Sequence, residues 1–217
     1  MRSSIEIHLT TVRIAAAVCA FALGGCIETR FESPIGDNIE TCDSGWKGLW
    51  VDGPDAVFYV NDACELIVLD PPEKPGPLKQ IHVPVNYVHA GGKDYVVIAD
   101  TAVKGLADVK PPHGITPVPE KSYFFARYKL RGDRLEMYQV DSERTAKLVV
   151  DGKLDGTLDK TQNELHVYVR GTRAKMLEMV RTQPIFDDKP VELTRSKQTL
   201  DEYDKSQAAD VSAGKAR

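Results

Sequence analysis

The fold class is indicated most clearly by residues 122–140, SYFFARYKLRGDRLEMYQV. Apolar and polar side chains alternate over 122–130 and again over 134–140, with the period of two that a half-buried strand requires. Arg131-Gly132-Asp133 separates the two runs, and a glycine between exposed polar residues is typical of a hairpin turn. The stretch therefore predicts two antiparallel strands, and we expect an antiparallel sheet around them.

Toward the C-terminus the hydrophobic period changes. Asp141 or Ser142 can cap a helix that runs through Val150, with Gly152 just past its end. A strand is predicted over 164–170, an amphipathic helix over 172–181, and a last strand over 190–194. Residues 196–217 contain almost no large apolar side chains, and we expect a disordered tail there.

Toward the N-terminus the chain reads as short strands separated by turns. The predicted strands cover 46–51, 57–61, 65–69, 79–89 and 93–99. Proline-rich stretches, within 71–77 and 104–120, forbid regular structure between them. We therefore expect one α+β domain over 46–195, with mainly antiparallel β-sheet of about eight strands and two short helices. Spacing alone leaves open whether the sheet stays open or curls toward a barrel.

The first 25 residues have the tripartite composition of an export signal. Cationic Arg2 and Arg13 precede an apolar run over 14–23, and two small residues follow, ahead of a cysteine. The run of about ten residues is too short to cross a bilayer as a helix, which takes roughly 20. A permanent membrane-spanning helix is therefore not expected.

Leu23-Gly24-Gly25-Cys26 resembles the lipobox of bacterial lipoproteins. The resemblance implies cleavage before Cys26 and acylation of that cysteine, so that acyl chains hold the protein to a membrane. Ile27 takes the place of an aspartate that commonly signals inner-membrane retention. In a Gram-negative source this implies the outer membrane, facing the periplasm. The alternative is an ordinary cleaved signal, with Cys26 an unmodified thiol.

Length and charge limit what the mature chain can be. Removal of residues 1–25 from the 217-residue chain leaves 192 residues, which is usual for one domain. Residues 26–45 are polar and contain Pro34 and Gly36, so we expect a tether there. The leader carries one net positive charge, so the formal charge of −4 becomes about −5 after cleavage. A nucleic-acid partner is therefore not expected.

Two cysteines, Cys42 and Cys64, remain after cleavage and acylation. An even pair in an oxidising compartment predicts a disulfide. Two free thiols are the alternative, because no further Cys or His lies at metal-ligand spacing from either residue.

Catalytic signatures are missing from the sequence. The chain has no G-x-S-x-G, G-x-G-x-x-G, Walker or H-E-x-x-H motif, and no cofactor is expected. The acidic pairs Asp187-Asp188 and Asp201-Glu202 fall in predicted loop and tail. The histidines of the mature chain are expected to be solvated surface residues: His82, His89, His113 and His166.

Gly48-Leu49-Trp50 and Arg195 are similar to the lipocalin pattern, in which an early tryptophan packs against an arginine near the end of the barrel. That resemblance implies a carrier of a small apolar ligand. The alternative is that Trp46 and Trp50 are ordinary core residues.

The mature region as a whole also resembles small Gram-negative envelope lipoproteins without an assigned activity. The likeness lies in the lipobox, the polar tether, the Trp46 to Trp50 start and the 123–138 hairpin. The first functional hypothesis is therefore a non-enzymatic lipoprotein that binds an envelope protein partner or serves a structural role. A lipocalin-like carrier is the second hypothesis and an enzyme the third.

Overall fold

The computed structural model describes residues 27–53, 55–70, 78–103, 111–112, 114–160 and 164–212. The predicted leader, the acylation site Cys26 and His113 lie outside these residues.

One sheet of twelve strands dominates the described part of the chain. Its strands are β1 Ile27–Phe31, β2 Gly48–Asp52, β3 Asp55–Val60, β4 Leu66–Asp70, β5 Lys79–Val83, β6 Asn86–Ala90, β7 Lys93–Ala99, β8 Tyr123–Arg131, β9 Arg134–Tyr138, β10 Gly156–Lys160, β11 Leu165–Val169 and β12 Val191–Arg195. The α-helices are α2 Ser142–Val150, α3 Arg173–Thr182 and α4 Leu200–Ser212, and the 3-10 turns are η1 Ser44–Trp46 and η2 Asp100–Val103.

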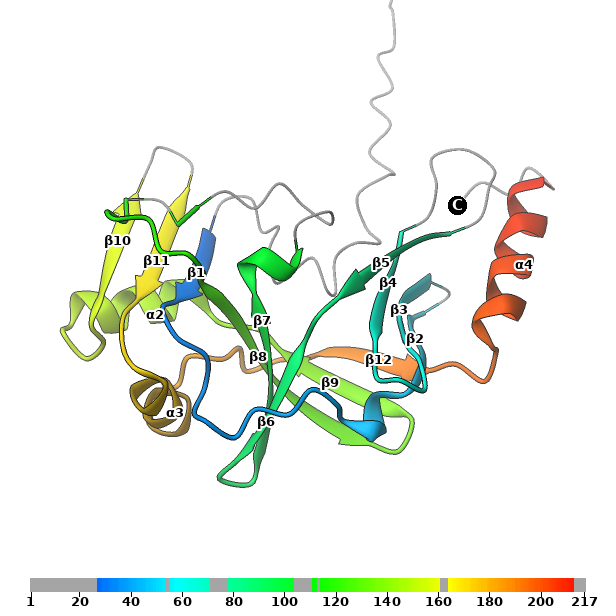
Figure 1. Ribbon diagram of the computed structural model, residues 1–217, viewed down its shortest axis with the longest axis horizontal. Coiled ribbons are helices and arrows are strands. Elements are labelled where there is room, and N and C mark those ends of the chain that lie inside the picture. The colour runs from blue at the N-terminus through cyan, green and yellow to red at the C-terminus, as the bar shows by residue number, and fades with distance from the viewer. Residues whose placement is uncertain are drawn as a thin grey trace, which may run out of the picture.

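The order of the strands divides the sheet into two regions. Strands run β10-β11-β1-β8-β9-β12-β2-β3-β4-β5, and β6 and β7 branch from β8. Figure 1 shows β10, β11 and β1 beside α2 and α3 at one end, and β2 to β5 with α4 at the other. Every ladder is antiparallel except the one between β1 and β11. The α+β, mainly antiparallel prediction is thus confirmed.

The predicted central hairpin is present, with Arg131 paired to Arg134, so the turn itself is only Gly132 and Asp133. Leu130 pairs with Leu135, and Gly132 takes a φ of 59° in the turn between β8 and β9. Both predicted helices are also present. The side chain of Asp141 accepts a hydrogen bond from the backbone N–H of Arg144 to cap α2, and Thr172 caps α3 through Lys175 in the same way.

Two separate hydrophobic cores fill the two regions. The larger core lies within the curl of the sheet and includes Trp46, Trp50, Phe58, Tyr87 and Tyr128. The smaller core lies between the β10-β11-β1 region and helices α2 and α3, and includes Phe31, Ile35, Val169, Met176 and Val180. A third apolar cluster joins α4 to β2 and β4.

The sheet curls but does not close. Among the described strands, no ladder joins β5 to β6, so the barrel that the spacing left open is not formed. Figure 1 shows β5 passing into β6 as one bent ribbon. Pro84 lies in this bend, and a proline has no backbone N–H to donate to a ladder.

Four expectations need correction. The sheet has twelve strands rather than about eight, and the described residues form three α-helices rather than two. Residues 27–31 of the expected tether form β1, where Ile27, Thr29 and Phe31 alternate with polar Glu28 and Arg30. Residues 200–212 of the expected disordered tail form α4, because Tyr203 finds an apolar site against the outer face of the sheet. The fold therefore begins at Ile27 and not near Trp46.

Candidate functional site

Cys42 and Cys64 form a disulfide, as predicted from their even number. Their Cα atoms lie 5.3 Å apart, and 22 positions of sequence separate them. The bond ties the segment before η1 to the turn between β3 and β4. Cys64 has a positive φ of 62°, which is uncommon outside glycine and reflects the tight turn that it ends.

The structure brings together the residues of the lipocalin resemblance. The guanidinium carbon of Arg195 lies 4.8 Å from the ring centroid of Trp50. Arg195 also donates hydrogen bonds of 2.8 Å to the carbonyl oxygens of Lys47 and Gly45. A Cβ on Gly48 would lie 3.3 Å from Cδ of Arg195, so glycine leaves room for the stacked arginine. The contact joins β12 to β2 and η1.

The space inside the curled sheet is occupied by aromatic side chains. The ring of Trp46 contacts those of Phe58, Tyr87 and Tyr128, at centroid distances of 5.0 to 5.6 Å. Trp50 donates a 2.7 Å hydrogen bond from Nε1 to the carbonyl of Trp46. Burial, and then the charge of Asp43, raise the pKa of Tyr87 well above its ordinary value. These contacts are those of a packed core.

The buried side chain of Arg30 links strand β1 to β8 and to η2. Arg30 is 3% exposed, and its guanidinium lies 5.3 Å from the ring centroid of Phe124 on β8. Nε is 3.1 Å from Glu28, and Nη1 is 3.6 Å from Asp100 in η2. Asp100 in turn accepts a 2.6 Å hydrogen bond from the hydroxyl of Ser122. The charge of Arg30 is therefore balanced by carboxylates from β1 and η2, as in a structural ion-pair cluster.

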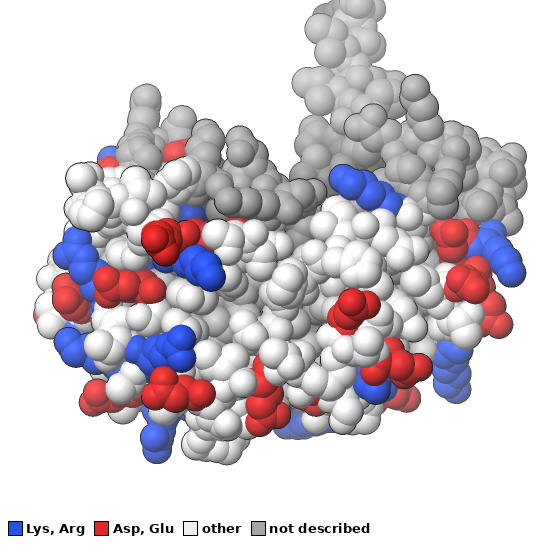
Figure 2. Space-filling view, in the orientation of Figure 1, with Lys and Arg blue, Asp and Glu red and all other residues white. Residues whose placement is uncertain are grey.

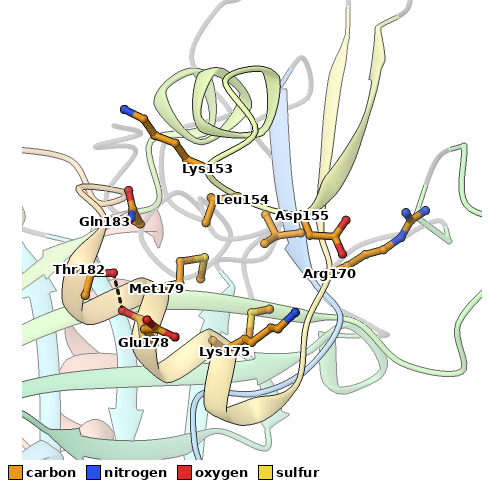
Figure 3. A pocket seen from close by; sticks show the side chains of 11 residues that line it. Lys153, Leu154, Asp155, Arg170, Lys175, Glu178, Met179, Thr182 and Gln183 are labelled. Atoms are coloured by element: carbon orange, nitrogen blue, oxygen red, sulfur yellow. Dashed lines mark hydrogen bonds between the residues drawn. The ribbon is translucent and has the colours of Figure 1, made fainter.

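A pocket of about 260 Å³ opens between α3 and the turn that follows α2 (Figure 3). Leu154 and Met179 face each other across it, whereas Lys153 and Arg170 extend away from it. The rim carries charges of both signs, since Lys175, Asp155 and Glu178 also line it. Ligand pockets for drug-sized molecules usually measure about 300–1,000 Å³. This hollow therefore fits one apolar side chain better than a whole carrier ligand.

The described histidines lie at or near the surface. His82 is exposed on β5, and His89 on β6 pairs with Asp94 through a 2.8 Å contact at Nδ1. His166 lies between Glu28 and Glu164, with ring nitrogens 3.2 and 3.1 Å from their carboxylates. Among the described residues, no group of three or more His, Cys, Asp and Glu is arranged to hold a metal ion.

Three of the remaining acidic sequence candidates, Asp188, Asp133 and Glu202, have structural partners. Asp188 pairs with Arg144 at 2.9 Å, and burial raises the pKa of neighbouring Asp187 above its usual value, with Asp141 adding to the shift. Asp133 of the Arg131-Gly132-Asp133 turn pairs with Arg195 at 3.3 Å. Glu202 accepts a 2.8 Å hydrogen bond from the backbone N–H of Thr199 at the start of α4. These acids hold turns and helix ends in place.

Sequence reasoning missed Arg30 and the pocket. Glu28, Thr29 and Arg30 make 27–31 polar enough to suggest a solvated tether, but the alternation of Ile27, Thr29 and Phe31 with charged residues is the signal that indicates a strand. The pocket combines residues from α3, β11 and the turn after α2, and no local pattern connects these segments.

The visible surface and the comparisons with known proteins add little that is specific. Figure 2 shows positive and negative side chains interspersed over the face in view. Within the described ranges, no helix combines the length and apolar character needed to span a bilayer. No protein-family model, curated protein or solved structure matches the chain.

Proposed function

We propose that this chain is a lipid-anchored protein of the bacterial cell envelope, acylated on Cys26, with a non-enzymatic binding or structural role. The observation that carries the proposal is Leu23-Gly24-Gly25-Cys26, placed one residue before the first strand of the fold. The Cys42–Cys64 bond supports it, because disulfides persist in oxidising compartments such as the periplasm. In a Gram-negative source, Ile27 favours the outer membrane.

The pocket beside α3 supports a protein partner. Binding energy at protein interfaces is concentrated in a few anchor side chains that fill small apolar pockets with polar rims. The floor includes Met176 and Met179, and methionine adapts its shape to the group that contacts it. We therefore place the partner contact at this pocket, with an apolar side chain of the partner inserted between Leu154 and Met179.

The second candidate function, a lipocalin-like carrier, is favoured by the stacking of Arg195 on Trp50. The aromatic packing around Trp46 argues against it, because those rings fill the space that an apolar ligand would need. Ligand-dependent quenching of tryptophan fluorescence by a fatty acid would support the carrier. A protein partner predicts no saturable change.

Metabolic labelling with an alkyne analogue of palmitate tests the anchor. The wild-type chain should be labelled and should stay with the membrane fraction after a high-salt wash, and Cys26→Ala should abolish both. Cys19→Ala is the matched control, because it removes a thiol from the same leader and should leave labelling unchanged. Labelling that survives Cys26→Ala would contradict the proposal.

Photocrosslinking in native envelopes tests the partner contact. A photoreactive residue at exposed Thr182, on the pocket rim, should capture one defined product. Lys175→Glu reverses a rim charge and should reduce that product several-fold, whereas Lys189→Glu, on an exposed residue outside the pocket lining, should not. Equal effects of the two reversals would argue against the pocket as the contact.

A further inference from the structure

The first strand leaves no room for a tether between Cys26 and the fold. β1 begins at Ile27, which pairs in parallel with Leu165 at the start of β11. Leu165 pairs in turn with Lys160 at the end of β10. These three residues therefore lie side by side along one edge of the molecule. We call these three residues, together with Glu164, which directly precedes Leu165, the anchor edge.

Backbone geometry sets how close this edge lies to an acylated cysteine. Consecutive Cα atoms are about 3.8 Å apart, and neighbouring strands are about 4.8 Å apart. Lys160 lies two strands from Ile27, so its Cα is about 10 Å from that of Ile27. A residue whose acyl chains enter a leaflet would thus hold the whole anchor edge at the level of the lipid headgroups.

Strand β1 is fixed within the fold and is not a free arm. Phe31 is fully buried and stacks on Phe125, with ring centroids 4.0 Å apart. The hydroxyl of Thr29 donates a 2.8 Å hydrogen bond to Ser142 at the start of α2. Arg30 adds its ion pair with Asp100 in η2. Releasing β1 to make a tether would break all of these contacts.

From this geometry we infer that the domain sits directly on the membrane in one preferred orientation, with the anchor edge against the headgroups. The inference rests on the acylation of Cys26 proposed above. Figure 1 shows the end of β10 and the start of β11 at the top of the molecule, on the opposite side from the turn between β6 and β7 at the bottom. That turn, at Gly91 and Gly92, therefore points away from the bilayer.

Charge does not set this orientation. Lys160 and Glu164 are both exposed and carry opposite charges, so the anchor edge has no long-range attraction to anionic lipid from these two residues. The covalent anchor and the rigid strand set the orientation instead. It is therefore insensitive to salt, which screens exposed charges beyond about 8 Å at physiological ionic strength.

Fluorescence quenching tests the orientation. Single Lys160→Cys and Lys93→Cys variants of the full chain are expressed in bacteria, purified with their acyl chains and labelled with the same fluorophore. Both lysines are exposed strand ends, so they form a matched pair. The proteins are placed in phosphatidylcholine vesicles that contain a lipid with a nitroxide on its headgroup. The label at position 160 should be quenched several-fold more than the label at position 93, at low and at high salt.

A linker insertion provides the internal control. Ten glycine and serine residues between Cys26 and Ile27 span about 17 Å on average and should let the domain turn freely. Quenching at the two positions should then converge. Equal quenching without the insertion, in protein whose acylation mass spectrometry has verified, would overturn the orientation and leave the anchor intact. Absence of acyl chains would overturn both.

Discussion

Arg195 contacts residues that are far apart in the sequence, and its role can be tested by one conservative change. Arg195→Lys keeps the charge but loses the planar stack on Trp50 and the paired hydrogen bonds to Lys47 and Gly45. We expect a loss of about 2 kcal/mol in the free energy of unfolding, measured by urea denaturation. Arg134→Lys alters an exposed pair with Glu192 and should leave the urea midpoint unchanged.

Loss of the Cys42–Cys64 disulfide should lower the free energy of unfolding more than Arg195→Lys does. Cys42→Ser opens a loop of 22 residues, which should cost about 3 kcal/mol in the free energy of unfolding by the chain-entropy argument. Thermal unfolding under oxidising conditions checks this. Wild-type protein in the presence of a reductant should unfold at the temperature of the variant, and a reductant should not shift the variant further. A wild-type midpoint that does not respond to reductant would contradict the structural role of the bond.

His89 predicts a pH dependence with a definite sign. Its hydrogen bond with Asp94 raises the pKa of His89 above its ordinary 6.5, the charges of Asp94, Asp43 and Glu40 add to this, and burial opposes it. The stabilisation is therefore fully present below pH 6.5 and is lost as the pH rises through the raised pKa. The effect should be small, because the side chain is 37% exposed. NMR titration should show the raised pKa, and Asp94→Asn should lower it.

For single residues, the sequence predicted two contacts. An even pair of cysteines, in a chain that is predicted to be exported, indicated the disulfide, and the lipocalin resemblance predicted the contact of Arg195 with Trp50. The burial of Arg30 could not be predicted in this way, because it depends on which strand and turn lie beside β1. A charged residue in a short polar segment is expected to be exposed to solvent, and only the residues that pack against it in the fold show otherwise.

Among the elements, those with strong local signals were predicted with nearly correct ends. Helix α2 combines a capping aspartate, an apolar face and Gly152 past its end. Strands β8 and β9 combine alternation with a glycine turn. Strand β10 was missed because its sequence, GTLDK, has only one large apolar residue, and the ladder to β11 determines its structure.

Strand β1 replaces the tether that the sequence predicts over 27–31, and hydrogen exchange can test whether this strand is formed. The backbone N–H groups of 27–31 that face β11 should be protected, because β1 pairs with β11 along its whole length, whereas β8 pairs with it only at Phe31. Exchange measured by mass spectrometry on a peptide that covers these residues should be slower than for an unstructured chain by orders of magnitude. Exchange at the rate of an unstructured chain would show that 27–31 is a tether after all, and it would contradict the inferred orientation.

Helix α4 predicts a loss of stability on truncation of one side chain. Tyr203 is 6% exposed and packs in a cluster with Leu49, Ile67 and Leu69. Tyr203→Ala should lower the free energy of unfolding by about 3 kcal/mol, measured by urea denaturation. Lys205→Ala changes an exposed residue of the same helix and should have no measurable effect. Equal midpoints for the two variants would show that α4 does not contribute to the fold.

For the whole molecule, the sequence predicted one α+β domain but not its division into two cores. Each core is built from strands that are distant along the chain, and β1 joins β11 across 138 positions. The open sheet could not be derived from strand spacing, because closure depends on whether β5 pairs with β6. The pocket beside α3 depends on the same long-range arrangement.

The proposed function and the inferred orientation both require that acyl chains on Cys26 anchor the polypeptide at the start of its fold. Intact-mass spectrometry of the protein extracted from bacterial membranes tests this requirement most directly. We expect the mature chain to begin at Cys26 and to carry a diacylglycerol group, with or without a further acyl chain on the new N-terminus. A chain that begins elsewhere, or one with an unmodified thiol at Cys26, would contradict this expectation.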